Sequence, residues 1–588
     1  MENWSDQARY WGVAPGYHDV FGRWRAASDA SVGTVVAALA AGESSAHAHL
    51  SPELQSNARA FQGDGDRVWG LAVQLYAVRS SHNWGIGDFS DLREAIATAA
   101  QAGASAVGLN PLHALFTDRP GAASPYGPSS RIFLNPLYIA VDALPDFEDT
   151  AELAERRAAL RSRPLVDYAG VAALKLAALR RCYGRFRESA SAERAADFAA
   201  FRAERGEALL RFACFEVLRL RFQSKPWREW PQPWRDPDRP AIDRLHHEEA
   251  EACGFVEYLQ WVADRQLAAC RDEAKRRKLA VGLYLDLAVG VDPAGADAWS
   301  NQRAIVAGLS IGAPPDEFNP AGQNWGLAPF NPHMLADNDF AALRALLGSA
   351  MRYAGAIRLD HVIGLMRLFL VPNGAPAADG VYVSYPLEAQ LSVIAQESHR
   401  HRCVFIGEDL GTVPEGFREI AQRWGVWTYR VMMFERWPNG DYKSPSDYPA
   451  DALAAFNTHD LPTYRGWIAG RDIEIKRSIG LDPGEDEAGR ARARGMLLRH
   501  LQPYAGPNEL TNFAATAGYL AATPSRLVMV AIDDLLDIEQ PINIPGTVDE
   551  YPNWRRVLPV PIEQWSAQPT FRAVKAAFDH AGRGRYGR

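Results

Sequence analysis

Eight short apolar runs, each followed by a loop and usually by a helical pattern, constrain the fold of this chain most. They span residues 68–78, 106–112, 281–287, 356–362, 403–410, 427–434, 452–461 and 526–535. Amphipathic stretches such as 91–103 and 386–399 lie between them. Continuous apolar strands that alternate with helices predict a parallel sheet covered by helices. A doubly wound open sheet gives a similar pattern, and the count of eight favours a closed (β/α)8 barrel, an α/β fold.

The uneven spacing of the runs predicts how the chain is divided. We expect a short N-terminal extension at 1–65, the barrel with its insertions at 66–575 and a tail at 576–588. The interval 113–280, rich in Ala, Arg, Leu and Glu, predicts a mostly helical subdomain between the second and third strands. The interval 290–337 is rich in Pro, Gly and Asn and predicts an extended loop after the third strand.

Composition excludes several classes of protein. The 588 residues carry a net charge of −8, which argues against a broad nucleic-acid surface. Five cysteines without CxxC spacing suggest neither a disulfide framework nor a zinc site, and favour a reducing compartment. We see no signal peptide and no apolar stretch long enough for a bilayer, so we expect a cytoplasmic protein with no membrane partner.

Acidic residues recur at the ends of the predicted strands, where a barrel of this kind forms its active site. The fourth run ends in IRLDH, the fifth in IGEDL and the seventh in NTHDLP, and the third contains LDL. These motifs supply Asp286, Asp360, Glu408 and Asp460. A salt bridge or a helix cap would explain any one of them. As a set they indicate function, because carboxylates gathered at a barrel mouth resist ionising together.

Two of these carboxylates suit chemistry at a glycosidic bond, which needs one group that attacks and one that donates a proton. Asp360 suits the nucleophile, because Arg358 projects to the same side of the strand and favours the ionised carboxylate. Glu408 suits the general acid and base, because acidic neighbours and burial bring a carboxyl pKa toward neutrality. Asp460 would hold ring hydroxyls of the sugar and favour an oxocarbenium-like transition state.

His361 and His459 adjoin two of these carboxylates. A single histidine beside an aspartate is usually structural. Because both histidines belong to the acidic set, we interpret them as hydrogen-bond donors to sugar hydroxyls.

Nine segments resemble, in order, the 4-α-glucanotransferases of glycoside hydrolase family 77, the amylomaltases or disproportionating enzymes, and more closely their longer bacterial type. They are VQLYAVRSSHNWGIGDFSDL (73–92), GLNPLHAL (108–115), SPYGPSSRIFLNPLYI (124–139), GAPPDEFNPAGQNWGLAP (312–329), IRLDHVIGLMRLF (357–369), YPLEAQL (385–391), IGEDLGTVP (406–414), THDLPTYRG (458–466) and INIPGTVDEYPNWRR (542–556). The segments cover nearly the whole predicted barrel, so the signal is far more specific than any single motif.

The resemblance places the family's nucleophile on Asp360, its acid/base on Glu408 and its third carboxylate on Asp460. The substrate-binding positions that it implies are Ser124, Tyr126, Asp286, Asp316, Gln323, Trp325, Arg358, His361, His459 and Asn543. For the family's acid after the third strand we choose Asp286, which lies at the strand end, and Asp292 is a nearby competitor.

The segment 314–326 resembles the loop that folds over bound glucan in this family, so 290–337 is expected to cover the substrate. It departs from shorter members at Glu317 and Pro320, where an aromatic and an acidic residue often stand. Contacts to the acceptor are therefore left open.

The activity implied by the resemblance is that of a retaining 4-α-glucanotransferase. Such an enzyme transfers a 1,4-α-D-glucan segment, through a covalent glycosyl-enzyme, to the 4-hydroxyl of an acceptor glucose or maltodextrin. The implied partners are therefore a glucan donor and a glucose or maltodextrin acceptor. No metal or organic cofactor is expected, and we find no glycine-rich loop that would cradle a phosphate.

Three other functions stay open as alternatives. A retaining α-1,4-glucan hydrolase would use the same carboxylates with an open acceptor site. A non-catalytic maltodextrin-binding protein would be expected to lack at least one of Asp360, Glu408 and Asp460, and all three are present. An oxidoreductase or nucleotide enzyme on an open sheet would need a phosphate-binding motif.

Overall fold

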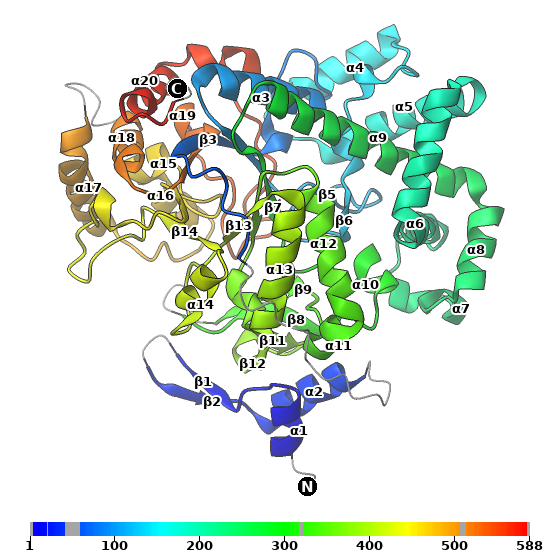
Figure 1. The fold of residues 1–588 in the computed structure, drawn as a ribbon, viewed down its shortest axis with the longest axis horizontal. Helices are drawn as coiled ribbons and strands as arrows, with labels where there is room; N and C mark the ends of the chain where they lie inside the picture. The colour runs from blue at the N-terminus through cyan, green and yellow to red at the C-terminus, as the bar shows by residue number, and fades with distance from the viewer. Residues whose placement is uncertain are drawn as a thin grey trace.

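The computed structural model describes residues 4–19, 22–41, 59–316, 319, 321–505 and 513–584. At its centre, eight parallel strands close into a barrel that is surrounded by helices (Figure 1). They are β3 (Val68–Val73), β4 (Ala106–Leu109), β7 (Gly282–Leu287), β10 (Ala356–Leu359), β13 (Val404–Gly407), β14 (Trp427–Val431), β15 (Ala452–Ala455) and β16 (Leu527–Ala531). The strands follow chain order round the barrel, and β16 pairs with β3 to close it. Each strand lies within one of the eight predicted runs, so the predicted barrel is confirmed.

The barrel interior is filled by side chains from alternate strand positions. These residues are Ala106, Tyr284, Ala356, Val404, Ile406, Trp427, Tyr429, Val431, Leu453, Ala455, Leu527 and Met529. Gly108 makes room for two of them, because a Cβ there would lie 2.6 Å from the ring of Tyr284 and 2.9 Å from Met529 Cε. Since the interior is packed, a ligand can bind only at an end of the barrel.

Helices pack against the outer faces of the strands. They are α3 (Phe89–Ala102), α9 (Ala250–Arg276), α12 (Ala341–Met351), α13 (Leu387–His401), α14 (Phe417–Arg423), α18 (Ala514–Ala522) and α20 (Pro569–His580). α3 shows how the sequence sets their bounds: a reciprocal cap between Asp88 and Asp91 begins it, and Gly103 ends it at φ 82°. Shorter or peripheral helices are α10 (Ala296–Ser300), α11 (Pro332–Ala336), α15 (Tyr464–Ala469), α16 (Arg471–Ser478), α17 (Glu487–Leu501) and α19 (Ile532–Leu535).

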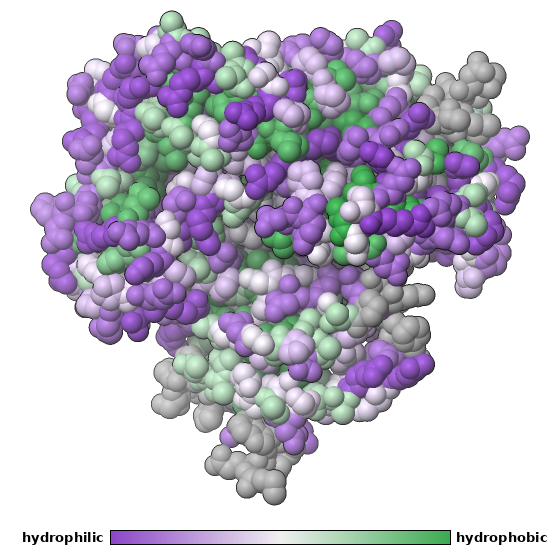
Figure 2. Space-filling model, turned by 180° about the vertical axis from the view of Figure 1, so that it is seen from behind, coloured by the Kyte–Doolittle hydropathy of each residue, from purple (hydrophilic) through white to green (hydrophobic). Residues whose placement is uncertain are grey.

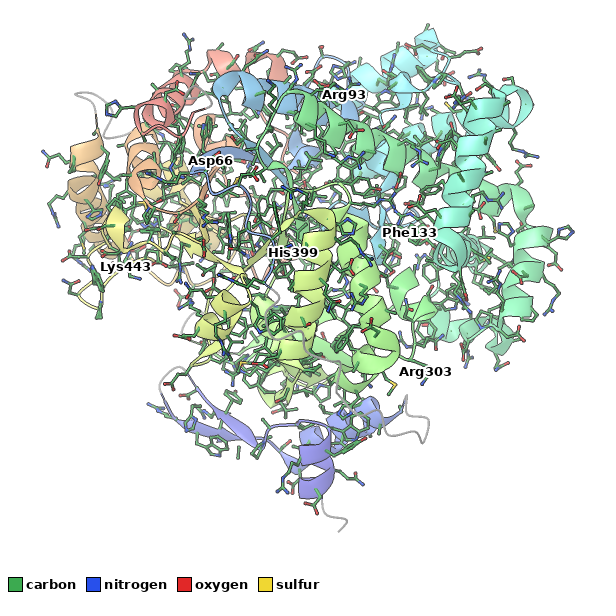
Figure 3. All side chains as sticks on the ribbon, in the orientation of Figure 1. Asp66, Arg93, Phe133, Arg303, His399 and Lys443 are labelled. Carbon is green, nitrogen blue, oxygen red and sulfur yellow. The ribbon has the colours of Figure 1, made fainter. Side chains whose placement is uncertain are left out.

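The interval between β4 and β7 is mostly helical and lies to the right of the barrel in Figure 1. It contains β5 (His113–Ala114), β6 (Ser130–Leu134), α4 (Ala151–Arg161), α5 (Tyr168–Ser189), α6 (Ala192–Arg221), α7 (Gln232–Arg235), α8 (Arg239–Glu248) and α9. Phe133 of β6 stacks on Phe212 of α6 at 4.4 Å, and Figure 3 labels it between the barrel and α6. α9 packs on α6, α3 and β7, so the insertion shares a helix with the barrel wall.

The interval 290–337 is not the extended loop that we predicted from its composition. It contains β8 (Leu309–Ala313) and β9 (Gln323–Leu327), which join β11 (Arg367–Pro372) and β12 (Val381–Ser384) in a four-stranded sheet of order β12-β11-β8-β9. The pairs within this sheet are antiparallel. Because β8 pairs with a strand that begins only at Arg367, local composition could not show that the segment is a sheet.

The N-terminal residues pack against this sheet (Figure 1). They form α1 (Trp4–Tyr10), β1 (Gly16–His18), β2 (Trp24–Ala26) and α2 (Asp29–Ala40). Trp11 and Leu39 are buried in one core with Ile311 and Leu370. The segment 4–41 is therefore part of a lobe that also contains the sheet, rather than a separate appendage.

The predicted tail at 576–588 begins too early. Residues up to His580 complete α20, and Arg583 is buried. Its guanidinium donates hydrogen bonds to the carbonyls of Val68, Ala521 and Thr523. Arg583, which we assigned to the tail, instead satisfies backbone carbonyls beside the first barrel strand. The last four residues of the predicted tail lie outside the described residues.

The surface is mainly hydrophilic when seen from behind, with short hydrophobic patches between polar side chains (Figure 2). Among the described residues, no helix is long and apolar enough to cross a membrane.

Candidate active site

A cavity opens inside the barrel mouth, at the end where the parallel strands terminate. Its empty volume, part of which is open to solvent, is about 790 Å³. Side chains that follow or end several strands line it, among them Asp286, Arg358, His459 and Asp533. The wall thus brings together residues that are far apart in the sequence.

Arg358 is the centre of the charged network at this mouth. The side chain extends from β10 and is almost fully buried. Its Nη1 donates to both carboxylate oxygens of Asp286, at 2.8 and 2.9 Å. Its Nη2 lies 2.9 Å from Asp360 Oδ1 and 4.0 Å from Glu408 Oε2. One guanidinium therefore contacts three carboxylates, from the ends of β7, β10 and β13, and holds them within one small region.

Glu408 directly follows β13, and its side chain is only 12% exposed. Backbone N–H groups of His361 and Leu410 donate to its two oxygens, at 2.9 and 2.8 Å. Burial raises the pKa of Glu408 from its ordinary value of 4.5 to about 7; Asp360 adds to the rise, while Arg358 opposes it. A carboxyl with such a pKa can both donate and accept a proton near neutral pH.

His361 holds an unusual backbone conformation between Asp360 and the next turn. Its φ is 50°, in the left-handed region that non-glycine residues seldom adopt. This conformation directs its N–H at Glu408 Oε2. Its ring packs edge-on against Trp325, with centroids 5.1 Å apart. The strained residue thus links the acid/base candidate to the sheet that contains β9.

Asp460 lies on the opposite side of the mouth, after β15. Asn543 Nδ2 donates to its Oδ1 at 2.6 Å, and His459 Nε2 lies 3.3 Å from its Oδ2. The protein around this half-exposed carboxylate removes part of its hydration and disfavours its charge, but His459 and Asn543 outweigh this effect and lower the pKa of Asp460 to about 2. Asp460 is therefore ionised at neutral pH, and its side chain is 46% exposed, so it can accept hydrogen bonds from a ligand.

Tyr126 connects the two halves of the site. Its hydroxyl donates to Asp286 Oδ2 at 2.6 Å and lies 3.2 Å from His459 Nδ1. Its ring stacks on His459 with centroids 4.7 Å apart, and Trp554 packs against both rings. Ser124 lies beside it and accepts a long hydrogen bond, 3.4 Å, from its backbone N–H.

The remaining predicted contacts lie on the sheet side of the mouth. Trp325 Nε1 donates to Gln323 Oε1 at 3.1 Å, and both residues belong to β9. Asp316 precedes β9 in a turn, where its Oδ1 accepts from Asn319 N at 2.6 Å. Trp325 reaches the central network through His361, whose ring it contacts. Glu317 and Pro320, where the sequence departs from the family, lie outside the described residues.

The two candidates for the acid after the third strand have different surroundings. Asp286 faces Arg358 and Tyr126 inside the mouth. Asp292 accepts from Ala294 N at 2.7 Å and lies 3.8 Å from Arg119. Asp286 therefore belongs to the constellation, while the described contacts of Asp292 stabilise the turn before α10.

Sequence reasoning missed several residues of the mouth. Tyr429 underlies Arg358, whose Cζ is 5.8 Å from the ring centroid, and Tyr284 lines the cavity. Asp533 lies after β16 and pairs with Arg556. The sequence held a signal for two of them. Tyr284 stands two positions before Asp286, on the same face of its strand, and Asp533 belongs to an acidic pair near the end of the eighth run, where other runs also carry acidic residues. Trp554 stands within a segment that the resemblance used, but no local pattern distinguished it.

Known proteins share this arrangement of sequence and fold. A family profile described as 4-alpha-glucanotransferase matches residues 73–561. The 4-alpha-glucanotransferase of Mycobacterium tuberculosis is 39% identical over 535 residues, which cover 86% of this chain and 72% of the relative. The chain belongs to the 4-alpha-glucanotransferase family. A second 4-alpha-glucanotransferase, from Haemophilus influenzae, is 38% identical over 84% of this chain and 76% of its own.

Solved structures agree with this membership. The crystal structure of amylomaltase from Corynebacterium glutamicum superposes with a TM-score of 0.85, at 26% identity, over 99% of both chains. Amylomaltase from Streptococcus agalactiae, solved with acarbose, shares the fold with a TM-score of 0.73 at 20% identity over 88% of this chain and all of its own. The predicted fold, family and 4-α-glucanotransferase activity are confirmed, and nothing favours the hydrolase or binding-protein alternatives.

Proposed function

We propose that this 4-α-glucanotransferase acts by a retaining, two-step mechanism with Asp360 as nucleophile and Glu408 as general acid and base. The observation that supports it is the contact of Arg358 with both carboxylates. A retaining mechanism needs two carboxyl groups about 5 Å apart, and side chains that meet at one guanidinium nitrogen can satisfy this. The raised pKa of Glu408 fits the acid, and the ion pair with Arg358 fits an ionised nucleophile.

In the first step, an Asp360 oxygen attacks the anomeric carbon of the donor, and the bond from that carbon to the leaving 4-oxygen breaks. Glu408 gives its proton to this oxygen, so the shortened glucan leaves with a free 4-hydroxyl. In the second step, ionised Glu408 takes the proton of an acceptor 4-hydroxyl, whose oxygen displaces Asp360. Two inversions retain the α configuration.

Asp460 and its neighbours are proposed to hold the sugar ring at the cleavage point. Asp460 Oδ1 faces Asn543 and its Oδ2 faces His459, and the carboxylate between them stays half-exposed. Hydrogen bonds to ring hydroxyls that strengthen in the transition state lower the barrier. We propose the same binding role for Ser124, Tyr126, Asp286, Asp316, Gln323 and Trp325, with a glucan donor and a glucose or maltodextrin acceptor as partners.

Preference for transfer over hydrolysis is proposed to depend on the sheet that contains β9. Trp325 covers His361 from this sheet, and an aromatic face can bind the apolar face of an acceptor glucose and exclude water from the glycosyl-enzyme. We also propose a cytoplasmic location, which the five free, buried cysteines support.

Maltotriose alone, with products separated by chain length, tests the proposal. We expect longer maltodextrins together with glucose, and an Asp360→Asn variant that binds maltodextrin but turns over at least about 10³-fold more slowly. Asp379→Asn, an exposed aspartate in the turn before β12, is the control and should keep full activity. Near-normal turnover by Asp360→Asn would remove it from the nucleophile role, and shorter products alone would show hydrolysis.

A further inference from the structure

Three potential metal ligands gather where the loop after β3 meets α3, and none of them lines the cavity at the mouth. His82 lies in the loop after β3, Glu94 in α3 and Glu563 in the 3-10 helix Ile562–Ala567. One ligand atom from each lies within 4.8 Å of the other two. In the part of the chain that the structure describes, this is the one such group of three or more His, Cys, Asp or Glu residues.

A buried carboxylate orients the histidine. Asp91 is fully buried, and its Oδ2 accepts hydrogen bonds from Asn83 Nδ2 and Asp88 N. Its Oδ1 accepts none from the described residues and lies 3.4 Å from His82 Nε2. In metal sites, a carboxylate commonly faces the remote nitrogen of a ligating histidine and fixes the ring. Because Asp91 faces Nε2 of His82, the other ring nitrogen, Nδ1, is directed at Glu94 Oε1, 3.8 Å away.

The two glutamates form a negatively charged site that is accessible from solvent. The backbone N–H of Ser81 donates to Glu563 Oε1 at 2.8 Å and places this side chain beside the other two. The ligand atoms of Glu94 and Glu563 lie within 4.8 Å of each other, so the two carboxylates repel one another and a cation between them would offset this repulsion.

We propose that His82 Nδ1, Glu94 and Glu563 bind one divalent zinc ion, with Asp91 as the outer carboxylate that orients His82. One imidazole nitrogen and two carboxylate oxygens suit zinc, and water would complete the coordination. Zinc–ligand bonds are about 2.0–2.2 Å, so the two glutamates must move closer to the imidazole, which their exposed side chains allow.

The proposed ion would fasten three segments of the chain together. The loop after β3, the first turns of α3 and the segment 558–567 already meet, through hydrogen bonds from Leu558 N to Ala77 O and from Ile562 N to Arg79 O. The segment 558–567 directly follows the stretch that places Asn543 and Trp554 at the mouth. The ion has no part in the transfer reaction, so its role is to stabilise this junction.

Calorimetric titration of the chelator-treated full-length protein with zinc chloride tests the site, with His82→Gln, Glu94→Gln and Glu563→Gln beside the wild type. We expect one zinc per chain in the wild type, and each substitution should weaken binding by at least about tenfold. Zinc should raise the melting temperature of the wild type but not of Glu563→Gln. Absorption bands of a cobalt(II)-substituted sample should show nitrogen and oxygen ligation and disappear in His82→Gln.

His401→Gln is the matched control. His401 also faces a buried glutamate, Glu397, at 3.8 Å. Arg344 and Arg400 neutralise that carboxylate, and among the described residues no third potential metal ligand lies beside the pair. We expect wild-type zinc binding from this variant. Absence of saturable zinc binding in the wild type would overturn the proposal, and so would unchanged binding in all three ligand variants. Maltotriose conversion is measured alongside, so a failed zinc site is distinguishable from a failed catalytic assignment.

Discussion

At the scale of single residues, the active site depends on how Arg358 shares its charge. It neutralises part of the negative charge of Asp286 and Asp360, while Glu408 is far enough from it, at 4.0 Å, for burial to dominate its ionisation. The sequence predicted the four carboxylates because parallel strands end at one edge of a barrel. It could not predict the distances, since Tyr126, 160 residues before Asp286, completes the network from a loop.

The ionisation of Glu408 makes stability depend on pH. Its folded-state pKa of about 7 exceeds the ordinary 4.5, so between these values the folded protein holds a proton that the unfolded chain releases. Stability from this group is therefore complete at low pH and is lost as pH rises toward 7. Glu408→Gln stays neutral, and we expect it to be more stable than wild type at pH 8, on the order of 2 kcal/mol. Denaturant unfolding at pH 4 and pH 8 measures the difference, which should disappear at pH 4.

Asp460→Asn provides a comparison of opposite sign. The folded-state pKa of Asp460 is lowered, so its ionised form stabilises the protein above the unfolded value and this stability is lost as pH falls toward 2. We expect Asp460→Asn to be less stable than wild type at pH 8.

Equal stability of Glu408→Gln and wild type at pH 8 would show that Glu408 is not held neutral by its surroundings.

At the scale of elements, the barrel strands were predictable and the sheet of β8, β9, β11 and β12 was not. Each barrel strand is a continuous apolar run, because helices or the packed interior cover both faces. In β9 the exposed residues alternate with less exposed ones, and its register shifts where it pairs with β8. Pro and Gly around these strands resemble a loop, and only pairing with residues after Arg367 makes them a sheet.

Gly312 permits the close approach of β8 and β9. A Cβ at this position would lie 2.1 Å from the backbone oxygen of Gln323, so Gly312→Ala must displace β9 and with it Trp325. We expect kcat/KM for transfer to fall by about 10–100-fold, since displacement of a substrate-positioning group by about 1 Å has this effect. Circular dichroism should show an intact barrel.

Gly184→Ala is the matched control for this substitution. A Cβ at Gly184, in α5, meets nothing within 4 Å outside its own helix, so we expect unchanged activity and a gain in stability of about 0.5–1 kcal/mol. Full activity of Gly312→Ala would mean that the position of β9 does not limit the reaction.

At the scale of the whole molecule, closure of the barrel brings together segments from both ends of the chain. β16 pairs with β3 along five residues, and Arg583, after α20, donates to the carbonyl of Val68 at the start of β3. Trp69 and Phe578 stack at 4.6 Å beside this junction. The sequence did not predict that Arg583 supports the closure of the barrel. The partners of its guanidinium are backbone carbonyls, and these have no sequence signature.

Arg583→Met should therefore destabilise the protein. It removes the charged donor of the Val68 and Thr523 carbonyls, while the Ala521 carbonyl keeps its hydrogen bond from Arg67, and we expect a loss of about 2–4 kcal/mol in the free energy of unfolding. Denaturant unfolding provides the measurement. Arg572→Met, an exposed position on α20, should change stability by less than about 0.5 kcal/mol. If both variants unfold alike, the buried guanidinium does not hold the ends together.

The hydrogen bond between Arg583 and Val68 also means that the barrel is almost a continuous loop of polypeptide. A linker from residue 584 to residue 66 would join the two ends of the barrel, with residues 4–41 supplied as a separate segment, and the chain could then be opened at another turn, such as the one near Gly440. In such a circular permutant, residues 4–41 would no longer precede the barrel, although the sheet that they cover is anchored through β11. If such a permutant folds and transfers glucan, the order in which the eight units are synthesised is separable from the ring that they form, and with it from the position of every carboxylate at its mouth.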